Sequence, residues 1–197
     1  MHFSLTVLLT LTLSAIALPA LAGFDWDNVI DVYPNVRWGI SELRDERPSP
    51  SRPVRLNLIK ANVTGIVDGD TIEATTVQQE DIVVQLACLD APEMSQEPWG
   101  QRAKERLAAL LTVGERVFLR IVDTDGAGRK VAEIYRGYHH IGIKMVDSGH
   151  AVVYTEYLDS CPITRDRYVQ AEVEAKQKRI GFWSQDNPVM PWDYRQQ

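Results

Sequence analysis

One short stretch decides how this chain folds: Val67-Asp68-Gly69-Asp70-Thr71. Its Asp-Gly pair separates two β-rich apolar runs, which is a strong hairpin signal. A polar segment at 78–81 predicts a second turn, and an apolar run from Ile82 to Leu89 follows it. We therefore expect three antiparallel strands, with Asp70 just after the first turn.

A second acidic cluster follows the third predicted strand: Leu89-Asp90-Ala91-Pro92-Glu93. Because strands joined by a turn can bring their ends together, we expect the carboxylates of Asp70, Asp90 and Glu93 to meet at one edge of the sheet. Hard divalent cations prefer oxygen ligands. The two clusters together therefore predict a divalent-cation site.

The rest of the chain supplies helices and two more strands. Apolar residues recur at helical spacing after Pro98, up to about Gly114. Thr164 is a candidate N-cap for a last helix that runs to about Arg179. The order β-β-β-α-β-β-α-α predicts an α+β protein, a five-stranded OB-fold Greek-key barrel with three helices. The remaining elements are strands at 116–122 and 130–135, a short helix at 141–147 and an extended segment at 151–154.

The composition fits one globular domain with N-terminal extensions, at 197 residues, 45% hydrophobic and 24% charged. An apolar run from Leu5 to Leu18 precedes Ala20-Leu21-Ala22, and this pattern predicts a signal peptide over 1–22. The alternative is a membrane anchor, but the run is shorter than the roughly 20 residues that a spanning helix needs. We therefore expect a secreted or periplasmic protein, monomeric and free of the membrane after cleavage.

Residues 23–53 form a predicted N-terminal arm that ends in a Pro-rich linker, and 54–197 form the predicted domain. In an oxidising compartment, Cys88 and Cys161 favour a single disulfide, although a buried free thiol at Cys88 is the alternative. The tandem His139-His140, expected in an exposed turn, lacks zinc-site spacing. The net charge of −6 argues against binding nucleic acid by charge alone.

Several motifs, in this order and spacing, resemble the thermonuclease (staphylococcal nuclease) family. The resemblance covers about 57–195 and implies an OB-fold barrel and a Ca²⁺-dependent phosphodiesterase or endonuclease. It also implies DNA or RNA as substrate and 3′-phosphate ends as products. The matching pieces are Val67–Thr71, Leu86–Glu93, Thr124-Asp125 with Gly128-Arg129, Ser148–Ala151, Ala171–Trp183 and Asn187–Arg195.

The resemblance also implies a role for each residue of the site. Asp70 and Asp90 match the carboxylate ligands of the metal, and Ala91 matches a ligand that uses its backbone carbonyl. Glu93 matches the carboxylate that activates or orients the attacking water, and Arg129 matches an arginine on the phosphate. These residue types suit the reaction, because phosphodiester hydrolysis needs a cation clamp and a positioned water.

One position departs from the family pattern. A second phosphate-binding arginine is usual five residues before the metal-binding aspartate, and Gln85 stands there in this chain. Losing that contact would lower the rate by about 10²–10³. The family's substrate-binding tyrosine matches Tyr154 or Tyr157.

Gln85 keeps a second function open, a catalytically impaired OB-fold module that binds nucleic acid or a protein partner. A third hypothesis is a structural envelope protein that interacts through the arm at 23–53.

Overall fold

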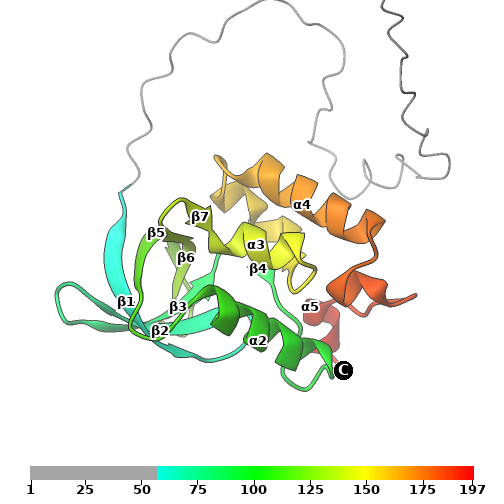
Figure 1. Ribbon diagram of the computed structural model, residues 1–197, viewed down its shortest axis with the longest axis horizontal. Helices are drawn as coiled ribbons and strands as arrows, with labels where there is room; N and C mark the ends of the chain where they lie inside the picture. The colour runs from blue at the N-terminus through cyan, green and yellow to red at the C-terminus, as the bar shows by residue number, and fades with distance from the viewer. Residues whose placement is uncertain (1–56) are drawn as a thin grey trace, which may run out of the picture. The chain divides into compact units, whose positions relative to one another are not determined.

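The computed structural model describes residues 57–197. The predicted signal peptide at 1–22 and the predicted arm at 23–53 lie outside the described residues. The described part of the chain is a β-barrel with helices packed against it (Figure 1). The barrel strands are β1 (Ile59–Ile66), β2 (Thr71–Thr76), β3 (Asp81–Leu86), β5 (Arg116–Thr124) and β6 (Lys130–Arg136).

The barrel closes because β3 pairs with two strands. Antiparallel pairing joins the strands in the order β3-β2-β1-β5-β6, and β3 also pairs in parallel with β6. In that closing pair, Gln85 is opposite Val131. The five-stranded barrel predicted from the sequence is therefore confirmed. Three short strands lie outside it: β7 (His139–His140) beside β6, and the pair β4 (Leu89–Asp90) and β8 (Val152–Val153).

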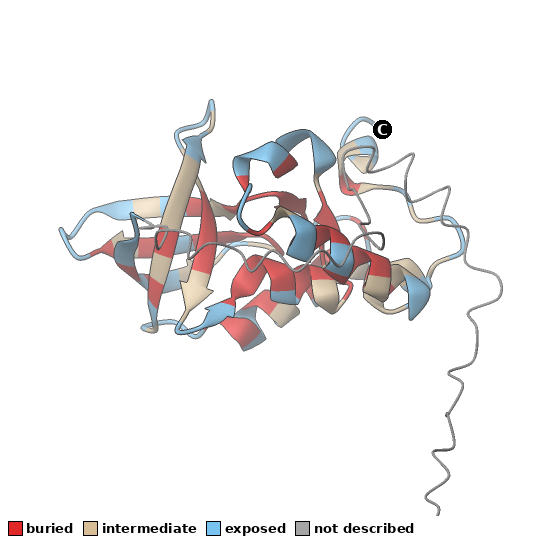
Figure 2. Ribbon diagram, turned by 90° about the horizontal axis from the view of Figure 1, so that it is seen from above, coloured by how far each residue is buried: buried red, intermediate tan, exposed pale blue. Residues whose placement is uncertain are grey.

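Each barrel strand buries one of its faces. Along β1, Ala61 and Val63 are buried, whereas the alternating residues Lys60, Asn62 and Thr64 are exposed. This period of two is what a pleated strand with one apolar face requires. Figure 2 shows that buried positions (red) run through the strands and the helices packed on them. Burial of each large aliphatic side chain stabilises the fold by roughly 1.5–3 kcal/mol.

Three helices match the three predicted: α2 (Trp99–Leu110), α3 (Ile141–Asp147) and α4 (Arg165–Gln177). Thr164 is the N-cap residue of α4, as predicted, but its hydroxyl donates to Glu133 and makes no capping hydrogen bond. Within residues 57–197, no helix has both the length and the apolar character to cross a membrane. The structure adds three short helical segments, η1 (Thr155–Ser160), η2 (Gly181–Ser184) and α5 (Pro191–Tyr194).

The Asp-Gly turn joins β1 to β2 as predicted. The N–H of Val67 donates to the carbonyl of Thr71 at 2.9 Å, and the N–H of Asp70 donates to Oδ1 of Asp68 at 3.1 Å. At Gly69, a side-chain carbon would lie 2.6 Å from Cβ of Ala103 and 2.7 Å from Cβ of Ala91. Glycine is therefore required here because α2 and the segment after β4 both pack against the turn.

The third predicted strand is interrupted. Its apolar run predicted one strand from Ile82 to Leu89, but β3 ends at Leu86 and Cys88 has a left-handed backbone with φ of 66°. A non-glycine residue rarely adopts this conformation, and it ends the strand because the chain turns sharply there. The chain then continues as β4, which leaves the barrel and pairs with β8. The sequence pattern missed the break because the apolar run continues through it.

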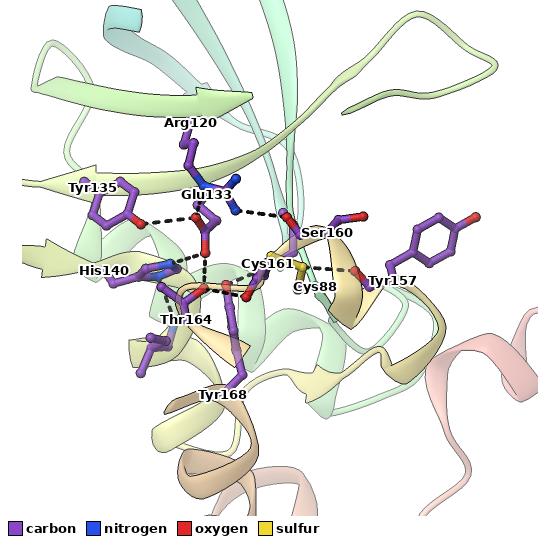
Figure 3. Close-up of a disulfide and its surroundings, with 12 residues drawn as sticks. Cys88, Arg120, Glu133, Tyr135, His140, Tyr157, Ser160, Cys161, Thr164 and Tyr168 are labelled. Carbon is purple, nitrogen blue, oxygen red and sulfur yellow. Dashed lines mark hydrogen bonds and ion pairs between the residues drawn. A yellow bond between two sulfur atoms is a disulfide. The ribbon is translucent and has the colours of Figure 1, made fainter. Parts of the chain in front are cut away.

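Cys88 and Cys161 are joined by a disulfide, the pairing that the sequence favoured (Figure 3). The bond links the chain after β3 to the end of η1, across 73 positions of sequence. The hydroxyl of Tyr168 on α4 also donates to the carbonyl of Ala87 at 3.0 Å. The break after β3 is therefore held in place from two other segments.

A buried carboxylate connects the barrel to the helices beside the disulfide (Figure 3). Glu133 on β6 is 1% exposed. The ring Nδ1 of His140 accepts from the N–H of Ile143, so its Nε2 carries the hydrogen and donates to Glu133 at 3.1 Å. This burial of His140 contradicts the expected exposed histidine pair. Glu133 also accepts hydrogen bonds from Arg120, Tyr135 and Thr164.

Burial alone would raise the pKa of Glu133, but the hydrogen bonds from His140, Arg120 and Thr164 outweigh it and lower the pKa to about 2. Because the folded-state pKa lies below the usual 4.5, the carboxylate stabilises the fold above pH 4.5. This contribution is lost as the pH falls from 4.5 towards 2.

We predict that Glu133→Gln destabilises the protein by about 3–5 kcal/mol at pH 7, because Arg120 loses its charge partner inside the fold. Urea unfolding at pH 7 and pH 3 measures the effect. The difference between variant and wild type should shrink at pH 3, and an equal difference at both values would contradict the assigned charge.

We also predict that Cys88→Ala with Cys161→Ala lowers the free energy of unfolding by about 4 kcal/mol, because the disulfide constrains a long loop in the unfolded chain. Thermal unfolding of the oxidised wild type and the double variant tests this. Thiol titration of the unfolded, unreduced wild type should find no free thiol, and two reactive thiols would exclude the disulfide.

Candidate active site

The hairpin turn and the strand break bring the two acidic clusters together. Asp70 stands at the end of the β1–β2 turn, and Asp90 is the last residue of β4. The N–H of Ala91 donates to Oδ2 of Asp70 at 2.8 Å, which ties the second cluster to the first. Asp70 and Asp90 are 7% and 3% exposed. Two carboxylates, one from the β1–β2 turn and one from β4, are therefore buried in the same cavity, as the sequence predicted.

Asp70 is held by neutral hydrogen-bond donors. Its carboxylate accepts from the N–H of Ala91 and from the hydroxyl of Thr71, and no Lys or Arg among residues 57–197 forms an ion pair with it. Burial and the negative charge of Asp68 raise its pKa well above the usual value. A buried carboxylate without a cationic partner is costly, and a bound cation would remove that cost.

The structure adds a residue that the sequence reasoning assigned no role, Arg195. Its guanidinium forms two parallel hydrogen bonds with Asp90, Nη1 to Oδ1 at 3.0 Å and Nη2 to Oδ2 at 2.7 Å. Nη1 also donates to Oε1 of Glu93 at 2.5 Å. Burial raises the pKa of Asp90, and the hydrogen bonds from Arg195 only partly offset it. The pKa of Arg195 rises, chiefly through its hydrogen bonds to Asp90.

The segment that carries Arg195 is anchored on both sides. The ring of Trp192 stacks on Tyr154, with centroids 5.2 Å apart and planes 16° from parallel. On the other side, the hydroxyl of Tyr194 donates to the carbonyl of Ser95 at 2.9 Å. The tail motif Asn187–Arg195 was visible in the sequence, but its place could not be read there, because it lies about a hundred residues from its partners.

Arg129 stands on the turn between β5 and β6. Gly128 has a φ of 84°, which lets the turn present the arginine. The Nε of Arg129 donates to Oδ2 of Asp125 at 2.7 Å, and its backbone N–H donates to Oδ1 of the same residue at 2.9 Å. The hydrogen bond from the Arg129 side chain lowers the pKa of Asp125. Asp125 therefore orients the guanidinium.

Two neighbouring cavities contain the predicted site residues. The acidic cavity, about 330 Å³, holds Asp70, Asp90, Ala91 and Glu93. The aromatic cavity, about 390 Å³, is lined by Tyr154 and Tyr157. Both cavities are lined by Gln85 and Arg129, which therefore stand where the two meet. All the residues predicted from the sequence to bind metal or substrate line one or both cavities.

The donor set suits a hard divalent cation without forming a complete cage. Among residues 57–197, no group of three or more His, Cys, Asp or Glu side chains is arranged to hold a metal ion. The carboxylates of Asp70, Asp90 and Glu93 line one cavity, as expected, but Arg195 forms hydrogen bonds with Asp90 and Glu93. Asp70 remains a buried carboxylate oxygen donor that faces the same cavity. Oxygen donors of this kind fit Ca²⁺.

Known proteins match this part of the chain. The family model described as "Staphylococcal nuclease homologue" matches residues 83–185. An "Uncharacterized endonuclease" of Haemophilus influenzae is 37% identical over 135 residues, which cover 68% of this chain and 72% of that protein. A "Micrococcal nuclease" of Shigella flexneri is 34% identical over 145 residues, which cover 69% of this chain and 80% of that protein. An "Uncharacterized 38.1 kDa protein" of Capnoides sempervirens is 34% identical, and the match covers only 43% of its length.

We predict that Asp70→Asn raises the stability of the metal-free protein at pH 7 by about 1–2 kcal/mol, because folding raises the pKa of the buried Asp70 carboxyl at a cost in free energy that a neutral amide avoids. Thermal unfolding in a chelator measures this, with the exposed Asp159→Asn as the control. Calcium should stabilise the wild type and not the Asp70→Asn variant. Equal stabilisation of both proteins would place the ion elsewhere.

Proposed function

Because this chain belongs to the staphylococcal nuclease family, we propose that it is an exported, Ca²⁺-dependent endonuclease that hydrolyses DNA and RNA. One observation carries the proposal: Asp70, Asp90, Glu93 and Arg129 come from three separate segments of the chain and line one cavity. A cavity that combines buried carboxylates with a guanidinium suits an anionic substrate that is bound together with a cation.

The carboxylates of Asp70 and Asp90 and the carbonyl of Ala91 are the groups that we assign to Ca²⁺. When bound, Ca²⁺ supplies a hard Lewis acid that offsets the negative charge of the phosphate. The hydrogen bonds of Asp70 to Ala91 and Thr71 orient its carboxylate in advance. Such preorganisation favours the transition state, since the ligand groups need not be reordered during the reaction.

Glu93 is the group that we assign to the attacking water. Its carboxylate accepts the proton as the water oxygen bonds to phosphorus. The bond from phosphorus to the 5′ oxygen breaks, and that oxygen leaves as a hydroxyl after taking up a proton. The products are a 3′-phosphate end and a 5′-hydroxyl end.

Arg129 binds the phosphate whose bond is broken. Its planar guanidinium can pair with two phosphate oxygens, and its hydrogen bond to Asp125 reduces the freedom that binding would otherwise cost. Beside it, the aromatic cavity offers Tyr154 and Tyr157 as surfaces for the nucleoside next to the phosphate. We assign substrate binding to both tyrosines and to Gln85.

Export and the monomeric state are also part of this proposal. The predicted signal peptide at 1–22 directs the chain out of the cytoplasm. The disulfide of Cys88 and Cys161 supports the same compartment, because disulfides persist where the environment is oxidising.

A second function is an impaired OB-fold module that binds nucleic acid or a protein partner without cleaving it. Two observations favour it: the neutral Gln85 at the junction of the two cavities, and the hold of Arg195 on Asp90 and Glu93.

Cleavage assays separate the two functions. We predict that the protein from Gly23 onward cuts single-stranded DNA and RNA in Ca²⁺, and that a chelator stops the reaction. Arg129→Ala and Glu93→Gln should each lower kcat/KM by about 10²–10³. Arg136→Ala is the matched control, since Arg136 pairs with Glu115 at the opposite end of β6.

If both the Arg129→Ala and the Glu93→Gln variants cleave at the wild-type rate, the active site does not lie in this cavity. No cleavage by the wild type at high concentration, together with retained oligonucleotide binding, would establish the binding module.

A further inference from the structure

One of the positively charged side chains that line the acidic cavity, Arg195, comes from the C-terminal segment. The lining of this cavity has four carboxylates, from Asp68, Asp70, Asp90 and Glu93, and two guanidiniums, from Arg129 and Arg195. α5, red in Figure 1, lies next to the loop that leads into α2, and Arg195 directly follows α5 in the chain. Without Arg195, the described lining would keep one guanidinium, which is already bonded to Asp125.

We propose that Arg195 is a catalytic, phosphate-binding residue, and that it supplies the second guanidinium that Gln85 cannot supply. This inference rests on the proposed nuclease function. Gln85 and Arg195 line the same cavity. The guanidinium of Arg195, which directly follows α5, therefore shares this cavity with the position at which the family has its second arginine. Two guanidiniums around one phosphate stabilise the charge on its oxygens more than one does.

Asp90 connects the position of Arg195 to metal binding. Both oxygens of Asp90 are bonded to the guanidinium, and Asp90 is also an assigned ligand of Ca²⁺. An oxygen cannot serve both cations fully, so Arg195 and Ca²⁺ compete for this carboxylate. The guanidinium released by Asp90 keeps its donors free for phosphate oxygens, which resemble carboxylate oxygens in geometry.

The anchoring of α5 makes this exchange a local movement. Trp192 is stacked on Tyr154, and the side-chain amide of Gln96 donates to the carbonyl of Val189 at 2.7 Å. These contacts do not involve the guanidinium, so they hold the segment in place when Arg195 leaves Asp90. An anchored arginine that moves only its side chain suits substrate binding better than a plug that must leave the cavity.

The experiment compares Arg195→Ala, Arg195→Lys and the double variant Gln85→Arg with Arg195→Ala. Arg136→Ala is the matched control, as it removes a similarly exposed, ion-paired arginine outside both cavities. Calorimetry measures Ca²⁺ affinity, and fluorescence anisotropy measures binding of a phosphorothioate oligonucleotide in Ca²⁺. Circular dichroism checks that each variant is folded, and cleavage assays give kcat/KM.

We expect Arg195→Ala to bind Ca²⁺ about tenfold more tightly, because a competing positive charge is removed. The same variant should bind the oligonucleotide about tenfold more weakly and lose about 10²–10³ in kcat/KM. Arg195→Lys should recover part of the oligonucleotide binding but not the full rate, since an ammonium lacks the two-pronged geometry. The double variant should recover at least about tenfold of the lost rate.

Other outcomes overturn the proposal. A faster Arg195→Ala enzyme would make the tail an inhibitory plug, and unchanged Ca²⁺ affinity would exclude competition at Asp90. No rescue by Gln85→Arg would mean that the two positions do not serve the same phosphate. If the wild type cleaves nothing, the nuclease proposal fails by itself. In that case oligonucleotide binding tests the role of Arg195 separately. Binding that Arg195→Ala leaves unchanged would overturn the proposal that Arg195 binds phosphate.

Discussion

The hydrogen bond from the Ala91 N–H to the Asp70 carboxylate is the contact on which the site depends. It forms because the chain leaves the barrel at Cys88, where a left-handed residue ends β3 and directs the next residues into β4. The disulfide to Cys161 and the hydroxyl of Tyr168 hold that break. Had β3 continued straight, Asp90 would have stayed in the barrel wall, away from Asp70.

Charge balance explains how four carboxylates share one small cavity. Arg195 pairs with both Asp90 and Glu93 and offsets part of their negative charge, whereas Asp70 has only neutral donors. The side of the cavity at Asp68 and Asp70 therefore stays more electronegative than the side at Asp90 and Glu93, where Arg195 lies. The family's nuclease chemistry, which combines a cation with a phosphate, suits such a cavity. The cation would offset the negative charge of the carboxylates and of the phosphate, and the guanidiniums would offset that of the phosphate.

A network of buried contacts beside the site connects the barrel to the helices. Glu133 joins β6 to His140 and to Thr164, so the barrel and α4 are connected through one buried carboxylate. The disulfide lies beside this network and attaches η1, which carries Tyr157 at the aromatic cavity. The aromatic cavity and the tail stacked on Tyr154 are therefore connected, through η1 and the disulfide, to the barrel.

The sequence by itself determined the barrel, because alternating apolar residues and an Asp-Gly turn are local signals that each strand carries. It also indicated Asp70, Asp90, Glu93 and Arg129 as candidate site residues, since their short motifs, in this order, resemble those of a known family. Only the tertiary structure decided the break at Cys88, the burial of His140 and the position of Arg195. Each of these depends on partners far away in the chain, and a contact between distant segments leaves no periodic trace in the residues that make it.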